Sequence, residues 1–269
     1  MMAKEYGRKL SIVAAMAVGL SVIALTLAPS AMAQISGTKH NLSTTGTGNA
    51  KSDESEICVF CHTPHGSATS AQVPLWNRAL AAPASYTTYS DIGGGTLDGT
   101  VEDVGSISLA CLSCHDGTQA LDTVLNAPGS GGYNASGARI AGLTWSGSNV
   151  DAATGKLLGS IVSMLGTDLS NDHPIGIQYG GYNPGSGQID PDFTVVTKHA
   201  TLNRWWVDTS GGTAGARDKT DMILYTRNDS GSEQPYVECA SCHDPHSSNN
   251  TFLRIANSGS AVCLACHDK

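Results

Sequence analysis

Large apolar side chains are scarce in this chain. Aromatic residues make up 6% of its 269 positions, with only three Phe, whereas glycine occurs 31 times. Such a composition leaves little side-chain volume for a large core, and burial of apolar surface is the main favourable term in folding. We therefore expect the interior to be completed by something other than the chain's own side chains.

Positive charge is also in short supply. Lys and Arg total 15 against 23 Asp and Glu, which gives a net charge of −8. Proteins that bind nucleic acid usually present basic patches, so nucleic acid is not an expected partner. A cationic or metallic partner is compatible with this charge.

Long apolar runs are missing beyond residue 33, and no later stretch could span a bilayer. Before that point, three basic residues precede a nearly all-apolar run over residues 10–28, followed by Ala31, Met32 and Ala33 as an A-x-A site. This pattern predicts a signal peptide over residues 1–33 and a mature, exported chain that begins at Gln34. The alternative is an uncleaved membrane anchor, because the apolar run approaches spanning length.

The eight cysteines all belong to four copies of Cys-x-x-Cys-His, at residues 58–62, 111–115, 239–243 and 263–267. This pattern predicts covalent attachment of haem c. Two cysteines one helical turn apart can add to the two vinyl groups of one porphyrin, and the next histidine can give its imidazole to the iron. The candidate attachment residues are Cys58, Cys61, Cys111, Cys114, Cys239, Cys242, Cys263 and Cys266, and the candidate proximal ligands are His62, His115, His243 and His267.

Two other interpretations of the cysteine pairs are open. A Cys-x-x-Cys pair can be a redox disulfide or half of a zinc site. The last two pairs are separated by twenty residues, which fits a zinc ribbon. Neither interpretation requires a histidine after every second cysteine, so the sequence favours four haems.

The second axial ligand decides what such a haem does, because an open position can bind a substrate and a closed one favours electron transfer. Methionine is nearly excluded, since only Met164 and Met222 follow residue 33, and Met222 begins an apolar run typical of a core. Five further histidines are available for four irons, so we predict bis-histidine ligation and low potentials. We assign His40, His65, His173 and His246 as distal ligands, with His199 as the alternative to any of them.

The four motifs are not equivalent. Motifs one and three continue with x-Pro-His, which places His65 and His246 three residues after a proximal histidine, whereas motifs two and four do not. Two axial nitrogens stand on opposite faces of the ring, so a histidine this close cannot serve the same iron. We expect each to reach a different haem; the alternative is a surface histidine in a turn. His173 precedes a proline, which favours an extended loop, and Asp172 could orient its ring.

The fold expected is that of a multihaem cytochrome c: largely irregular backbone, with short helices at the haem sites and a few short strands, wrapped around a chain of four haems. Strand-like runs lie among glycine-rich turns, and two further segments are weak helix candidates. We divide the mature chain into residues 34–130 with haems one and two, a Gly/Ser-rich covering region 131–235, and a module 236–269 with haems three and four. The predicted strands are 139–145, 175–179, 193–197, 204–207 and 222–226, and the weak helices are 75–80 and 156–165.

Residues 236–269 resemble the doubled-CXXCH cytochromes. Together with residues 40–43, 58–66 and 172–176, they resemble the secreted tetrahaem cytochromes of metal-reducing bacteria that polymerise into extracellular filaments. That resemblance implies bis-histidine haems in a continuous stack, export beyond the outer membrane, and a histidine that crosses a subunit interface. It also supports His40 as a ligand.

The function expected is therefore electron transfer, not enzyme catalysis, because all four motifs end in histidine and enough histidines remain to close every iron. The leading hypothesis is a filament of copies of this chain that passes electrons to other cytochromes and to extracellular acceptors such as metal oxides. The alternatives are a monomeric shuttle in the periplasm or at the cell surface and, less favoured, a multihaem oxidoreductase with one exchangeable axial position.

Overall fold

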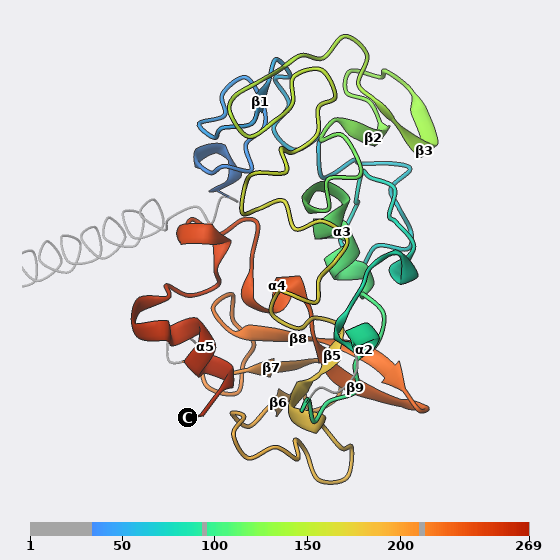
Figure 1. Ribbon diagram of the computed structural model, residues 1–269. Helices are drawn as coiled ribbons and strands as arrows, with labels where there is room; N and C mark the ends of the chain where they lie inside the picture. The colour runs from blue at the N-terminus through green and yellow to red at the C-terminus, as the bar shows by residue number, and fades with distance from the viewer. Residues whose placement is uncertain (1–33, 93–95, 210–212, 269) are drawn as a thin grey trace, which may run out of the picture. The chain divides into compact units, whose positions relative to one another are not determined.

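The computed structural model describes residues 34–92, 96–209 and 213–268 (Figure 1). These belong to a compact unit, Gln34–Lys269. The predicted signal peptide lies outside the described residues. Among the helices that are described, none has the length and apolar character needed to cross a membrane.

Helices are short and lie mainly at the predicted haem sites, as the sequence indicated. Helix α3 (Ser106–His115) contains the second motif, α4 (Cys239–Cys242) the third, and α5 (Ala261–Cys266) most of the fourth. The first motif forms turns instead. The described residues also contain the single-turn helix α2 (Tyr89–Ile92) and 3-10 segments at Gln34–Gly37, Pro83–Ser85, Tyr179–Gly181, Asn250–Phe252 and Ser258–Ser260.

The two weak helix predictions are wrong. In the segment 75–80, Leu75 has a left-handed φ of 58°, and its carbonyl accepts a hydrogen bond from the N–H of Thr63. In the segment 156–165, the backbone N–H of Leu165 donates to the carbonyl of His115 instead of to its own helical turn. Both segments therefore use their backbone groups to hold a haem motif.

The strands of the described residues form three antiparallel sheets. The largest has the order β5-β9-β8-β7-β6, and α4 lies beside β8 while also contacting α3 (Figure 1). Two small sheets pair β1 with β4 and β2 with β3. The strands are β1 (Lys51–Ser52), β2 (Thr123–Asn126), β3 (Tyr133–Arg139), β4 (Trp145–Ser146), β5 (Ile177–Gln178), β6 (Thr197–Lys198), β7 (Trp205–Val207), β8 (Met222–Asp229) and β9 (Ser232–Val237).

Strand prediction succeeded where apolar residues are dense. The runs 204–207 and 222–226 coincide with β7 and β8, and 175–179 contains β5. The run 193–197 contributes only its last residue to β6, and 139–145 is mostly turn between β3 and β4. Strand β9 escaped prediction because it contains Pro235 and Glu233, residue types that are depleted in strands.

The apolar core is divided into small clusters, two of which pack against attachment cysteines. One cluster contains Phe60 and Trp145 and packs on Cys61 and Cys114. A second, built on β7 and β8, includes the fully buried Met222 and packs on Cys242 and Cys266, and a third surrounds Leu112. Met222 therefore belongs to the core, as predicted. The side chains alone build no single large core in the described part of the chain.

Asn77 ties the first motif to the β2 strand. Its side chain is fully buried, and its Nδ2 donates to the carbonyl of Val59 at 2.7 Å and to that of Asn126 at 2.9 Å. Its Oδ1 accepts the N–H of Asn126 at 2.8 Å. Three backbone groups thus depend on one side chain.

Replacing Asn77 with Ala should destabilise the haem-loaded protein, because it leaves these backbone groups buried without a partner, at a cost of about 1–3 kcal/mol. Urea unfolding followed by circular dichroism measures the change. Asn134, which is exposed, provides the matched control, and N134A should unfold close to the parent. Equal midpoints for N77A and the parent would contradict the assignment.

Candidate haem sites

Cysteines of consecutive motifs lie near one another in the folded chain. No disulfide joins them in the described residues. Burial raises the pKa of Cys61 to about 12, and the neighbouring Cys114 thiol adds to the rise. A hydrogen bond between Cys111 and Cys239 raises the pKa of the first thiol and lowers that of the second.

Motifs three and four also bring their thiols close together. Burial raises the pKa of Cys266 to about 12, and the nearby Cys242 thiol adds to the rise. Thiols of motif one therefore neighbour those of motif two, motif two neighbours motif three, and motif three neighbours motif four. The four Cys-x-x-Cys-His motifs therefore form a continuous series of neighbours.

Motifs one and three are held in the same way by the segment that follows each. In motif one, His62 forms an isolated antiparallel bridge with Trp76, and the preceding residue, Leu75, has a left-handed φ of 58°. In motif three, His243 forms the same bridge with Leu253, and Phe252 has a φ of 59°. The residue after the partner donates its N–H to the carbonyl of the second cysteine at 2.9 Å in both cases. The equivalent pairs are His62 and His243, Leu75 and Phe252, Trp76 and Leu253, and Asn77 and Arg254.

Most of the candidate ligand histidines have an acceptor beside Nδ1. A carbonyl or a carboxylate accepts only, so Nδ1 carries the proton and leaves the Nε2 lone pair for a metal. The Nδ1 acceptors are Pro74 O for His62 (2.8 Å), Ser163 O for His115 (2.6 Å), Thr251 O for His243 (2.8 Å), Pro174 O for His173 (3.0 Å), Pro245 O for His40 (3.4 Å) and Asp244 Oδ1 for His246 (3.4 Å).

His199 has the opposite arrangement. Its Nδ1 accepts the backbone N–H groups of Thr201 and Leu202, each at 3.2 Å. The proton of the neutral ring must then sit on Nε2, which removes the lone pair that an iron would need there. This local turn argues against His199 as a ligand.

Three pairs of imidazoles lie at a nearly constant centroid separation, although their interplanar angles range from 16° to 66°. The ring centroids are 6.3 Å apart for His62 and His246, 6.1 Å for His40 and His115, and 6.5 Å for His173 and His267. Each pair joins one proximal histidine to one predicted distal histidine. Two iron–nitrogen bonds of about 2 Å, plus about 1 Å from each nitrogen to its ring centre, would separate the centroids by roughly 6 Å.

His65 and His243 are the candidates left over, and the described residues give no ring contact of this kind between them. His65 is exposed, and its carbonyl accepts a hydrogen bond from Thr63 Oγ1 at 2.9 Å. The structure thus brings together six of the eight candidate ligands in pairs.

His40 does not lie on a loose tail. Its ring stacks on Phe252 with centroids 3.9 Å apart. The next residue, Asn41, is fully buried and donates to the carbonyl of Ser36 at 2.9 Å. Burial lowers the pKa of His40 to about 4, so the ring is neutral at pH 7, which is the form that binds a metal.

Sequence reasoning missed Glu238, which directly precedes Cys239. Its side chain is 2% exposed, and Ser108 on α3 donates its hydroxyl to Oε2 at 2.5 Å. The same hydroxyl accepts the N–H of Cys239 at 2.9 Å. The pair therefore joins motifs two and three. A glutamate is usually exposed, so its sequence position alone gave no signal.

The zinc alternative lacks support from the arrangement of side chains. Within the ranges that the structure describes, no three of the His, Cys, Asp and Glu side chains converge as they would around a metal ion. The twenty-residue spacing of the last two cysteine pairs is therefore not accompanied by a ligand cluster.

Burial raises the pKa of Glu238 from 4.5 to about 7. Because the folded state binds this proton more tightly than the unfolded state, stability should fall as the pH rises between 4.5 and 7, by on the order of 3 kcal/mol. E238Q should flatten this part of the profile and be more stable than the parent at pH 8. Urea unfolding across pH measures this, with E56Q at an exposed position as the control. An E238Q profile parallel to the parent would refute the prediction.

Comparison with known proteins identifies part of the chain. Residues 234–269 match the family model of the doubled CXXCH motif. No curated protein matches the chain. The irregular backbone, short helices and few short strands fit a cytochrome c. The motifs indicate covalently bound haem c, and the doubled CXXCH motif supports a c-type cytochrome that transfers electrons.

Proposed function

We propose that this chain carries four haems, each fixed by two cysteines and closed by two histidines, and that it conducts electrons along them. The observation that supports this most is the recurring spacing of 6.1–6.5 Å between proximal and distal imidazoles. Three unrelated pairs of segments present the same gap, although sequence alone gives them no common spacing.

The proposed axial pairs are His62 with His246, His115 with His40, and His267 with His173. By elimination, His243 pairs with His65. Motifs one and three would then exchange their x-Pro-His histidines, which fits their matching hydrogen bonds. The Nδ1 acceptors support these assignments, because they hold each imidazole in the tautomer and orientation that a metal requires.

The chain's own residues set the chemistry of these sites. Haem iron supplies a one-electron Fe(III)/Fe(II) change when bound. Small apolar clusters pack against Cys61, Cys114, Cys242 and Cys266 and would shield that side of each attachment point from water. With both axial positions filled by histidine, no site remains for a substrate, so this proposal favours electron transfer over an enzyme.

The order of the cysteines supports one continuous route. Motif one neighbours motif two through Cys61 and Cys114, and motif two neighbours motif three through Cys111 and Cys239. Motif four follows motif three within the matched module, and the thiols of Cys242 and Cys266 neighbour each other. An electron would pass from haem to haem in the order of the chain.

We further propose that copies of the exported chain assemble into an extracellular filament that delivers electrons to acceptors such as metal oxides. The resemblance to filament-forming tetrahaem cytochromes supports this. Large apolar side chains at the surface are also available for association, among them Val162 (96% exposed), Val195 (73%) and Ile189 (66%). A monomeric periplasmic or surface shuttle is the second candidate.

H173A should keep all four haems attached but open one iron. Added carbon monoxide should then bind the reduced protein to about a quarter of its haem content, whereas the parent should bind none. H199A is the matched control and should behave as the parent, because its Nδ1 accepts two N–H groups. Carbon monoxide binding by H199A but not by H173A would reverse the assignment.

Electron microscopy and size-exclusion chromatography of the native secreted protein test assembly. Filaments of haem-staining material are expected. Monomers alone under all conditions, with low-spin haem spectra unchanged, would reject the filament and leave the electron shuttle.

A further inference from the structure

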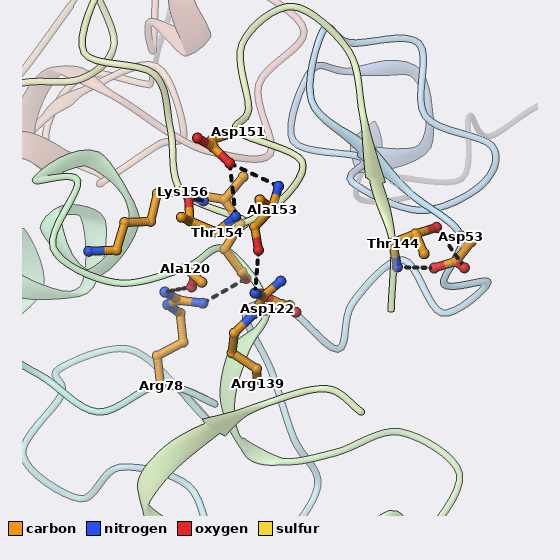
Figure 2. Close-up of polar contacts among 11 residues, drawn as sticks. Asp53, Arg78, Ala120, Asp122, Arg139, Thr144, Asp151, Ala153, Thr154 and Lys156 are labelled. Atoms are coloured by element: carbon orange, nitrogen blue, oxygen red, sulfur yellow. Dashed lines mark hydrogen bonds and ion pairs between the residues drawn. The ribbon is translucent and has the colours of Figure 1, made fainter. Parts of the chain in front are cut away.

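Arg78 is a fully buried cation whose partners are all neutral. Nη2 donates to the carbonyls of Ser113 at 2.7 Å and Ala120 at 2.8 Å, and Nη1 donates to that of Leu121 at 2.7 Å. Nε donates to the Ser113 hydroxyl at 3.1 Å. Figure 2 shows the guanidinium directed at the loop that contains Ala120.

Arg78 forms no ion pair with a carboxylate of the described residues. The nearby Asp122 is fully buried but pairs with Arg139 at 3.1 Å (Figure 2). Burying a charge without a counter-charge is expensive, even when its hydrogen bonds are made. A guanidinium stays protonated inside proteins, so the site holds a fixed positive charge at every working pH.

This charge lies between the first two haem motifs. Ser113, which accepts two of its hydrogen bonds, stands between the two cysteines of motif two. The preceding residue, Asn77, donates its N–H to the carbonyl of Cys61 in motif one at 2.9 Å.

We propose that Arg78 raises the reduction potentials of the haems held by motifs one and two. Reduction of ferric to ferrous iron removes one positive charge, so a nearby cation favours the reduced form. The effect is strong where low-dielectric surroundings replace water. With haems bound, the change that Arg78 would bias is a one-electron transfer from Fe(II) of one haem to Fe(III) of its neighbour, with no bond or proton exchanged. Electrons would therefore collect at this end of the haem series. This inference rests on the proposed haem binding.

Arg254 shows why burial matters here. It follows the third motif at the place equivalent to Asn77, and its Nε donates to the carbonyl of Ala240 at 3.0 Å. Arg254 is only half-buried, so water screens its charge. Of the two arginines, the buried one should have the larger effect on its haems.

Redox titration of the haem-loaded protein, followed by its visible absorption, tests the proposal. R78Q removes the charge. The part of its redox titration curve that belongs to the haems of motifs one and two should shift to more negative potential. R78K keeps the charge and should stay near the parent. R254Q should shift its curve less than R78Q. A role in packing alone would shift R78K as far as R78Q, because both variants lose hydrogen bonds to Ser113, Ala120 or Leu121.

Asp116 provides an independent arm if R78Q fails to mature. This carboxylate is also buried, accepts the hydroxyl of Tyr86 at 2.7 Å and lies beside His115. D116N removes a negative charge from the same end of α3 and should shift part of the curve to more positive potential.

Three results would overturn the inference: an R78Q curve that coincides with the parent, R78K shifted as far as R78Q, or a D116N curve that does not move. Each would leave haem binding intact. Absence of a c-type haem spectrum in the parent protein would instead reject the proposed function itself, so the two failures are distinguishable.

Discussion

The position of the proton on each imidazole is the constraint on which the candidate haem sites depend. Where a carbonyl or carboxylate lies beside Nδ1, as for His62, His115 and His173, the opposite nitrogen is free to bind iron. Where backbone N–H groups donate to Nδ1 instead, as for His199, the opposite nitrogen carries the proton and cannot bind iron. The irregular backbone serves this purpose, because its turns bring single carbonyls to single rings in a way that regular helices and strands, whose carbonyls are already paired, do not.

The same backbone explains why the apolar clusters are small. Two of the three, around Phe60 and around Met222, pack against attachment cysteines. The interior would then be continuous only when flat apolar groups lie between the clusters. Polar links fix these parts relative to one another: Asn77 joins motif one to β2, and the Ser108–Glu238 pair joins motifs two and three. Stability and electron transfer would thus rest on the same contacts.

The sequence predicted what depends on local pattern. The cysteine motifs, the short helices at three of them and the strands β7 and β8 follow from residues close together in the chain. The sequence predicts a helix over residues 75–80, but contacts with motif one hold Leu75 at a left-handed φ that a helix cannot contain. The burial of Arg78 and Glu238 could not be foreseen, since charged residues are rarely buried. The choice between His199 and the other histidines depended on hydrogen bonds that only the folded turns create.

The distance along the chain between facing histidines has a consequence for biogenesis. The ring of His40 meets the carbonyl of Pro245, 205 residues later, and His62 faces His246 near the carboxyl end. A chain exported from its amino terminus would present its first two motifs for haem attachment well before His246, the proposed partner of His62, emerges. The first haem attached would then spend this interval with one axial position unfilled. On the proposed pairing, the site of motif one would be completed only when His246 arrives, whereas motif two would find its partner, His40, already exported.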